Sequence, residues 1–66
     1  MTLAEVIKSR RKKLSLTQGD LAQMSGVSLA TVKDIERGEG NPSLSTASKL
    51  LELLGVEIVY KLRQTV

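Results

Sequence analysis

Apolar residues recur every three or four positions along most of the chain, and short polar or glycine-containing stretches separate the apolar segments. This spacing predicts a first amphipathic helix over about residues 2–13, a second of about seven residues after Thr17, a third after Ser28, and a fourth ending near Gly55. The apolar positions that carry the pattern are Leu3, Val6, Ile7 and Leu14; Leu21, Ala22 and Met24; Val32 and Ile35; and Leu50, Leu51, Leu53 and Leu54. The sequence therefore predicts a predominantly helical domain.

Turn-forming residues mark where these helices should begin and end. The candidate N-caps are Thr2, Thr17, Ser28 and one residue of the run 43–46. Gly26 suits the left-handed conformation of a sharp turn, and Gly38 stands where a glycine is expected just after a helix. Residues 39–43 are expected to form a surface loop, because Pro42 disfavours helix at the residue before it.

Beyond Gly55 the apolar period changes from helical to two, which predicts a β-strand. The chain offers no second strand, so the edge groups of this one would stay unpaired within a single copy. We therefore expect pairing with the same strand of a second copy across a two-fold axis; a frayed terminus or a strand packed alone are the alternatives. The predicted dimerisation residues are Val56, Ile58, Tyr60 and Leu62. The expected fold is thus all-α, with four to five helices over residues 1–55 and a C-terminal strand and tail over residues 56–66.

Composition narrows the possible chemistry. The 66 residues are expected to form one domain with a marginal core, and they include no Cys or His. This excludes zinc fingers, disulfide frameworks, His-dependent triads and Cys nucleophiles, so we expect no enzyme activity, no metal site and no cofactor. There is no signal-like start and no apolar run long enough to span a bilayer, so the expected location is the cytoplasm, without membrane association.

The net charge is +3, and half of the ten basic residues lie within six positions. These are Lys8, Arg10, Arg11, Lys12 and Lys13. Arg11 follows Ile7 by four residues and so lies on the apolar face, where a charge is costly unless it is paired. The three lysines are either a solvated face or a surface that attracts phosphates.

Spacing within residues 18–37 suits two short helices that cross at a steep angle. Such a crossing needs a small side chain at the closest approach, here Ala22, and a turn glycine, here Gly26. Val32 and Ile35 would then face inward on the second helix of the pair, leaving its outer side free.

Over about residues 3–55 the sequence resembles the phage-repressor and Cro-type (XRE) helix-turn-helix family. The segments that carry the resemblance are Leu14-Ser15-Leu16-Thr17-Gln18, Leu21-Ala22, Ser25-Gly26-Val27-Ser28 and Ile35-Glu36-Arg37-Gly38. The segment Asn41-Pro42-Ser43-Leu44 and the tail look most like the small Hip-type antitoxin-repressors of that family.

The resemblance implies a repressor that binds double-stranded DNA as a homodimer on an inverted repeat. The alternative function is an antitoxin-type interaction module that mainly neutralises a partner toxin. The resemblance also implies that Arg11 pairs with Glu36, and that the third helix enters the major groove. The implied DNA-binding residues are Gln18, Ser28, Leu29, Ala30, Lys33, Asp34, Arg37, Asn41 and Ser43.

Different roles are expected within this set. Gln18 would hold a phosphate at the start of the second helix. Lys33 would contact guanine and Ala30 a thymine methyl group, while Asp34 would either accept a bond from cytosine or repel phosphates. Arg37 and the loop residues are candidates for the DNA backbone. An exposed apolar side chain at Leu29 indicates contact with DNA or with a neighbouring side chain.

Overall fold

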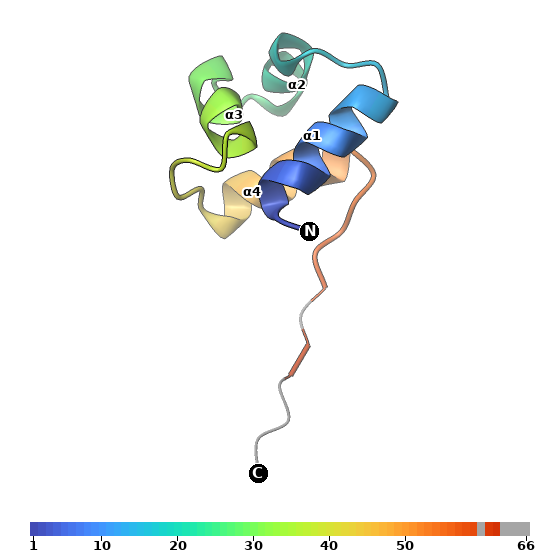
Figure 1. Cartoon of the computed structure of the whole chain (residues 1–66), viewed down its shortest axis with the longest axis vertical. Helices are drawn as coiled ribbons and strands as arrows, with labels where there is room; N and C mark the ends of the chain where they lie inside the picture. The colour runs from blue at the N-terminus through green and yellow to red at the C-terminus, as the bar shows by residue number, and fades with distance from the viewer. Residues whose placement is uncertain (60, 63–66) are drawn as a thin grey trace.

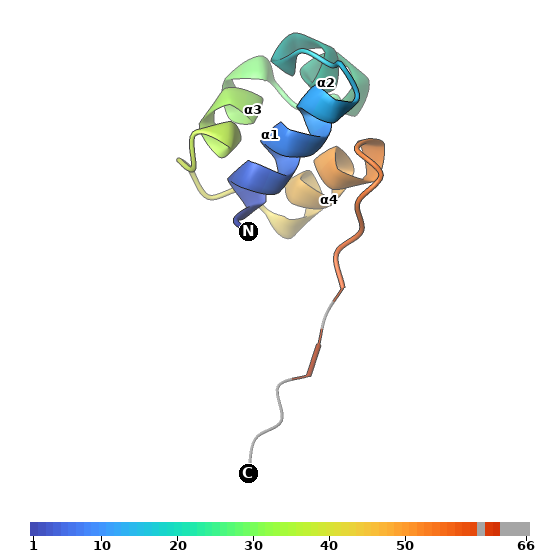
Figure 2. The ribbon, with the colours of Figure 1, turned by 45° about the vertical axis from the view of Figure 1, so that its right-hand side comes forward.

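The computed structural model describes residues 1–59 and 61–62, which form four helices (Figure 1). The helices are α1 (Leu3–Lys13), α2 (Gln18–Ser25), α3 (Leu29–Glu36) and α4 (Leu44–Leu53). α3 packs against α1 and α2, and α2 also packs against α4. Figures 1 and 2 show α1 crossing the molecule, with α4 beside it and the segment after α4 leading away from the helices. The all-α class and the four predicted helices are confirmed for the described residues.

Each helix begins at a hydroxyl residue that accepts a hydrogen bond from the backbone N–H three residues later. Thr2 and Thr17 do so in capping boxes, in which Glu5 and Asp20 in turn accept from the backbone N–H of the threonine. Ser28 and Ser43 cap α3 and α4 through the N–H groups of Thr31 and Thr46. The predicted caps at Thr2, Thr17 and Ser28 are confirmed, and the cap of α4 is Ser43.

The core is aliphatic and draws on every helix. Fully buried side chains come from α1 (Ile7), α2 (Leu21), α3 (Val32) and α4 (Leu50), and Leu54 closes the core after α4. Burying a side chain of this size contributes about 1.5–3 kcal/mol. Among residues 1–59 and 61–62 the interior is filled by small and branched side chains, and close contact between them holds the four short helices in place.

α4 ends in a turn that fixes the start of the following segment. The backbone N–H of Val56 donates to the carbonyl of Leu51 at 2.9 Å, and Gly55 adopts the left-handed conformation with φ 75°. Val56 and Ile58 are half-buried against the core, whereas Glu57 is exposed. Alternate side chains of this segment thus lie toward and away from the helices.

The predicted C-terminal β-strand is wrong: residues 56–59 and 61–62 form no strand. A strand requires a partner for its backbone N–H and C=O groups, and the four helices of this chain offer none. Over residues 56–58 the period of two instead accompanies packing of Val56 and Ile58 on the helical core, whereas Leu62, in the same register, is fully exposed. Tyr60 and residues 63–66, also part of the predicted strand and tail, lie outside the described residues.

Candidate nucleic-acid interface

The turn between α2 and α3 sets the angle at which α3 meets the rest of the domain. Gly26 ends α2 in the left-handed conformation at φ 76°, and its N–H donates to the carbonyl of Ala22 at 3.0 Å. The Ser25 hydroxyl accepts from the N–H of Val27 at 3.1 Å, which fixes the next residue of the turn. Ala22 is buried in the core, so the small side chain and the turn glycine have the positions that the sequence predicts.

A buried ion pair ties α3 to α1. Arg11 donates from Nε to Oε2 of Glu36 at 2.7 Å and from Nη2 to Oε1 at 2.9 Å, with side-chain exposures of 11% and 2%. A third guanidinium nitrogen, Nη1, donates to the carbonyl of Leu16 at 2.8 Å. The pairing implied by the resemblance is therefore confirmed. Buried charges are tolerated when they are paired and hydrogen-bonded in this way.

The electrostatic environment keeps Glu36 ionised. Burial acts to raise the pKa of its carboxyl group, but hydrogen bonds from Arg11 and Gln18 and the positive charges of Arg11 and Lys8 together lower it. The hydrogen bond to Glu36 likewise raises the pKa of the Arg11 guanidinium. The pair therefore stays charged in neutral solution.

Gln18, predicted to hold a phosphate, takes part in the same network. Its Nε2 donates to Oε1 of Glu36 at 3.2 Å from the first residue of α2. Nε2 carries two hydrogens, so the bond to Glu36 leaves a second one for another acceptor. The carboxylate of Glu36 thus connects α1, α2 and α3, and it orients the side chain at the start of α2.

The outer face of α3 carries much of the predicted contact surface. Val32, Ile35 and Glu36 are buried on the inner side of the helix. Leu29, Ala30 and Lys33 are exposed on the opposite side, and the N-cap Ser28 is exposed at its start. The separation of the two faces agrees with the predicted division between packing and contact residues.

Arg37 and Asp34, both predicted to contact DNA, are paired with each other. Arg37 donates to the Asp34 carboxylate, and its Nε lies 3.5 Å from Oε2 of Glu39. All three side chains are largely exposed, so these pairs contribute little to stability. Of the two loop residues, Asn41 is exposed, and the hydroxyl of Ser43 is engaged in the cap of α4.

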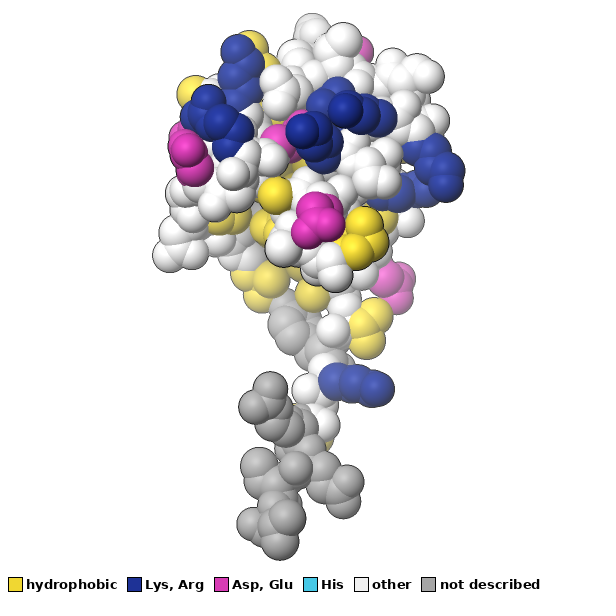
Figure 3. All heavy atoms as spheres, in the orientation of Figure 1, with side chains coloured by type: hydrophobic (Ala, Val, Ile, Leu, Met, Phe, Trp, Pro, Cys, Tyr) yellow, Lys and Arg dark blue, Asp and Glu magenta, His cyan; other side chains and the backbone are white. Residues whose placement is uncertain are grey.

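The basic cluster of α1 divides into structural and exposed residues. Arg10 is half-buried, and its Nε donates to the carbonyl of Leu54 at 3.1 Å, where α4 ends. With Arg11 also paired, the exposed cations of the cluster are Lys8, Lys12 and Lys13. Figure 3 shows Lys and Arg side chains over α1 and α3 on the same face of the molecule. The role of Arg10 was missed, although its spacing from Val6 and Ile7 places it on the inner face of α1.

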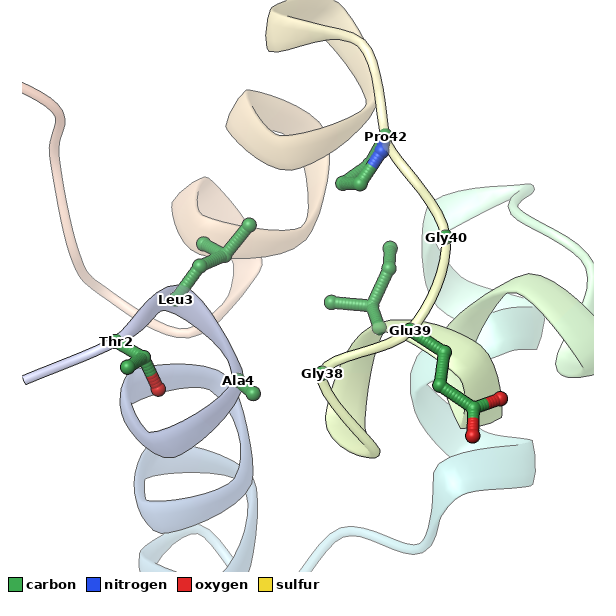
Figure 4. A pocket seen from close by; sticks show the side chains of 8 residues that line it. Thr2, Leu3, Ala4, Gly38, Glu39, Gly40 and Pro42 are labelled. Carbon is green, nitrogen blue, oxygen red and sulfur yellow. The ribbon is translucent and has the colours of Figure 1, made fainter.

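A pocket of ≈ 300 Å³ lies between the start of α1 and the loop after α3 (Figure 4). The side chains of Leu3 and Pro42 point toward one another across it, and the carboxylate of Glu39 points away. The Thr2 hydroxyl at its edge is already bonded in the N-cap of α1. The side chains that face into the pocket are therefore mainly apolar.

Metal ions and membranes each place their own requirements on the residues that the structure describes. No group of three or more His, Cys, Asp or Glu side chains in that part of the chain is placed to hold a metal ion. None of its helices has the length and hydropathy needed to cross a bilayer.

The α2–turn–α3 unit, the buried ion pair of α3 and the exposed outer face of that helix define a helix-turn-helix domain. A family model for the helix-turn-helix matches residues 7–61, and the chain belongs to the XRE-type helix-turn-helix family. The narrower likeness to Hip-type antitoxin-repressors stays a prediction.

Several curated relatives share this domain. The chain is 41% identical over 58 residues to the immunity repressor protein of Bacillus phage phi105, covering 88% of this chain and 40% of the relative. It is 35% identical over 54 residues to candidate HTH-type transcriptional regulatory proteins of Saccharolobus islandicus and Saccharolobus solfataricus, covering 82% of this chain and 17% of each relative. The chain therefore spans less than half the length of these relatives.

Proposed function

We propose that this chain is a non-enzymatic, sequence-specific DNA-binding domain that represses transcription. The observation that carries the proposal is the outer face of α3, which the Arg11–Glu36 pair and the Gly26 turn hold away from the core. In helix-turn-helix proteins the second helix of the motif lies in the major groove. A relative named as an immunity repressor supports the regulatory role.

Contacts to the DNA backbone would come from groups on either side of α3. Gln18 stands at the N-terminus of α2, where backbone N–H groups and the helix dipole favour a phosphate. Lys8 and Lys12 add exposed positive charge along α1. The sequence predicts three further contacts to the DNA backbone, from Arg37, Asn41 and Ser43. Phosphate contacts of this kind fix the register of α3 but carry no sequence information directly.

The proposed operator is an inverted repeat bound by a homodimer. α3 has 8 residues, so one copy can contact only a few base pairs. Two copies related by a two-fold axis present two such helices about 34 Å apart, which matches half-sites separated by one helical turn. The dimer would also raise the positive charge facing DNA.

We place the proposed dimer contact in the segment after α4. Val56 and Ile58 are half-buried on their own core, whereas Val59 and Leu62 are exposed at 73% and 101%. The exposed pair leaves apolar surface for a second copy. Sedimentation of a Leu62→Asp variant should show more monomer than the unmodified chain, with Ser45→Asp on α4 as the control. Equal association of all three would contradict this placement.

The proposed function is tested by titrating the chain against a randomised duplex library at several salt concentrations. We expect enrichment of one inverted repeat and an affinity that falls steeply as salt rises, because bound phosphates release counterions. Equal binding to all duplexes, or no binding, would overturn the proposal. Nothing in the described residues favours the alternative of toxin neutralisation, so we do not propose it.

A further inference from the structure

We infer that the chain recognises its half-site largely through thymine methyl groups, contacted by Leu29 and Ala30, with Lys33 as the one long polar donor. The inference rests on the proposed function and specifies what α3 reads. It follows from which polar groups at the surface are already bonded within the protein and which side chains remain available.

The hydroxyl groups at the start of α3 are engaged in capping. Ser28 Oγ accepts from the Thr31 N–H at 3.2 Å and donates its only proton to Thr31 Oγ1 at 2.8 Å. A hydroxyl has one donor and two acceptor positions, so Ser28 retains only weak acceptor capacity. Ser28 could therefore donate to a base only if its bond to Thr31 opened, and the Thr31 hydroxyl, which keeps its own proton, belongs to a short, half-buried side chain.

The other polar candidates are engaged as well. The Asp34 carboxylate accepts from Arg37, which also lies beside Glu39. Gln18 donates one Nε2 hydrogen to Glu36, and the second is the one proposed above to hold a phosphate. A base contact by Asp34 would have to break its ion pair and bring a carboxylate close to phosphates, which is unfavourable.

Three side chains remain on the outer face of α3, and two of them are apolar. Leu29 is 42% exposed and Ala30 is also exposed, while Lys33 lies one helical turn after Leu29. The apolar group that major-groove edges present to a helix is the C5 methyl of thymine, which also distinguishes A·T from T·A. Burial of Leu29 against that methyl removes apolar surface of both groups from water.

Charge favours DNA over a protein partner as the occupant of this face. The exposed cations Lys8, Lys12 and Lys33 belong to α1 and α3, and basic side chains over these two helices share one face (Figure 3). An apolar protein-binding patch would more usually be depleted in charge at its centre. A polyanion with a few apolar groups on its surface matches a helix that exposes Leu29 and Ala30 together with Lys33.

The test replaces thymine by uracil, one position at a time, in the duplex that the library selects. Uracil keeps the base pair and every groove acceptor and removes only the methyl group. We expect affinity to fall by about fourfold at one or two positions in each half-site, as the loss of one buried methyl group predicts. Selection of a duplex followed by equal binding to every uracil-substituted form would overturn this inference and leave the proposed function intact.

Protein variants assign the methyl contact to a side chain. In Leu29→Ala, the ratio of affinities for the thymine and uracil duplexes should approach one at the position that Leu29 contacts. Leu53→Ala, which truncates a leucine exposed to 37% on α4, is the matched control and should leave that ratio unchanged. If neither Leu29→Ala nor Ala30→Gly changed the ratio of affinities for the thymine and uracil duplexes at any position, other residues would read the methyl groups. That result would overturn the assignment.

Discussion

The carboxylate of Glu36 in α3 and the guanidinium of Arg11 in α1 form a buried two-point pair, with N–O distances of 2.7 and 2.9 Å. Gln18 of α2 donates to the same carboxylate. One side chain on the inner face of α3 therefore connects three helices, while the proposed base contacts lie on the outer face of that helix. This arrangement allows stability and binding to be changed separately.

Removing one partner of the pair should destabilise the chain strongly. Glu36→Ala leaves the Arg11 guanidinium buried without a counter-charge, and we expect a loss of about 3–5 kcal/mol in the free energy of unfolding. Urea denaturation followed by circular dichroism measures the loss. Glu57→Ala, at an exposed site, is the control and should change little.

The double variant Arg11→Met/Glu36→Leu keeps the test informative if the single variant does not fold. It removes both charges and retains apolar volume, so it should be more stable than Glu36→Ala. A double variant less stable than the single one would argue against an uncompensated charge as the cause.

Stability should fall at acid pH in a way that reports on Glu36. Its pKa in the folded chain lies below the ordinary value of 4.5, so the folded state binds a proton less readily than the unfolded state. The stabilisation is fully present above that value and is lost as pH falls through the lowered pKa. Glu5 and Asp20, whose pKa values are lowered by hydrogen bonds with Thr2 and Thr17, contribute to the same decline.

Comparison with Glu36→Gln isolates the share of Glu36 in this pH dependence. The variant cannot ionise at this position, so its unfolding free energy should depend less on pH below 4.5 than that of the unmodified chain. Urea titrations at a series of acid pH values measure both slopes. Parallel curves would contradict the assignment.

The sequence predicts the helices well because their limits depend on nearby residues. Thr2, Thr17 and Ser28 each cap a helix by bonding to a group three residues away, and Gly26 forms its turn without help from distant parts of the chain. These interactions are visible in a short window of sequence. The predicted strand failed because its existence depends on a partner, and a period of two also describes an extended segment such as residues 56–59 packed on helices.

Only part of the site could be predicted, because some of its interactions leave a local pattern in the sequence and others depend on distant residues. The spacing of Arg11 from Ile7 indicated a buried charge, and the family resemblance supplied Glu36 as its partner. Arg10 bonds to the carbonyl of Leu54, 44 residues away, and no side-chain pattern marks a backbone acceptor. The pairing of Arg37 with Asp34 has a local signal, because residues three apart on a helix are neighbours, and it was overlooked.

Arg10 and Lys12 should have separable effects despite their similar charge. Arg10→Ala removes the bond to the Leu54 carbonyl, and we expect it to cost about 1 kcal/mol of stability. Lys12→Ala should leave stability nearly unchanged but reduce the slope of log affinity against log salt by about one unit, if Lys12 neutralises a phosphate. Unfolding curves and salt titrations of both variants make the comparison. Identical behaviour of the two variants would contradict the division of the basic cluster.

Ser15 offers a stabilising substitution. It adopts φ 58° in the turn after α1, a left-handed conformation that strains residues with a Cβ atom. Ser15→Gly should raise the free energy of unfolding by roughly 0.5 kcal/mol, since relief of strain outweighs the greater freedom of glycine in the unfolded chain. Ser15→Ala keeps the Cβ atom and should give no gain. A thermal melt that ranks alanine above glycine would show that this turn is unstrained.

The central claim is that Lys33, on the outer face of α3, contacts a base in the selected site, and Lys33→Ala tests it most directly. The measurement is the ratio of affinities for the selected inverted repeat and for a scrambled duplex of equal length and composition. We expect Lys33→Ala to lower this ratio by roughly tenfold, as the loss of one base contact predicts. Lys49→Ala, at an exposed lysine of α4, should leave the ratio unchanged. An equal loss of affinity on both duplexes, or none, would contradict base recognition by Lys33 and with it the central claim.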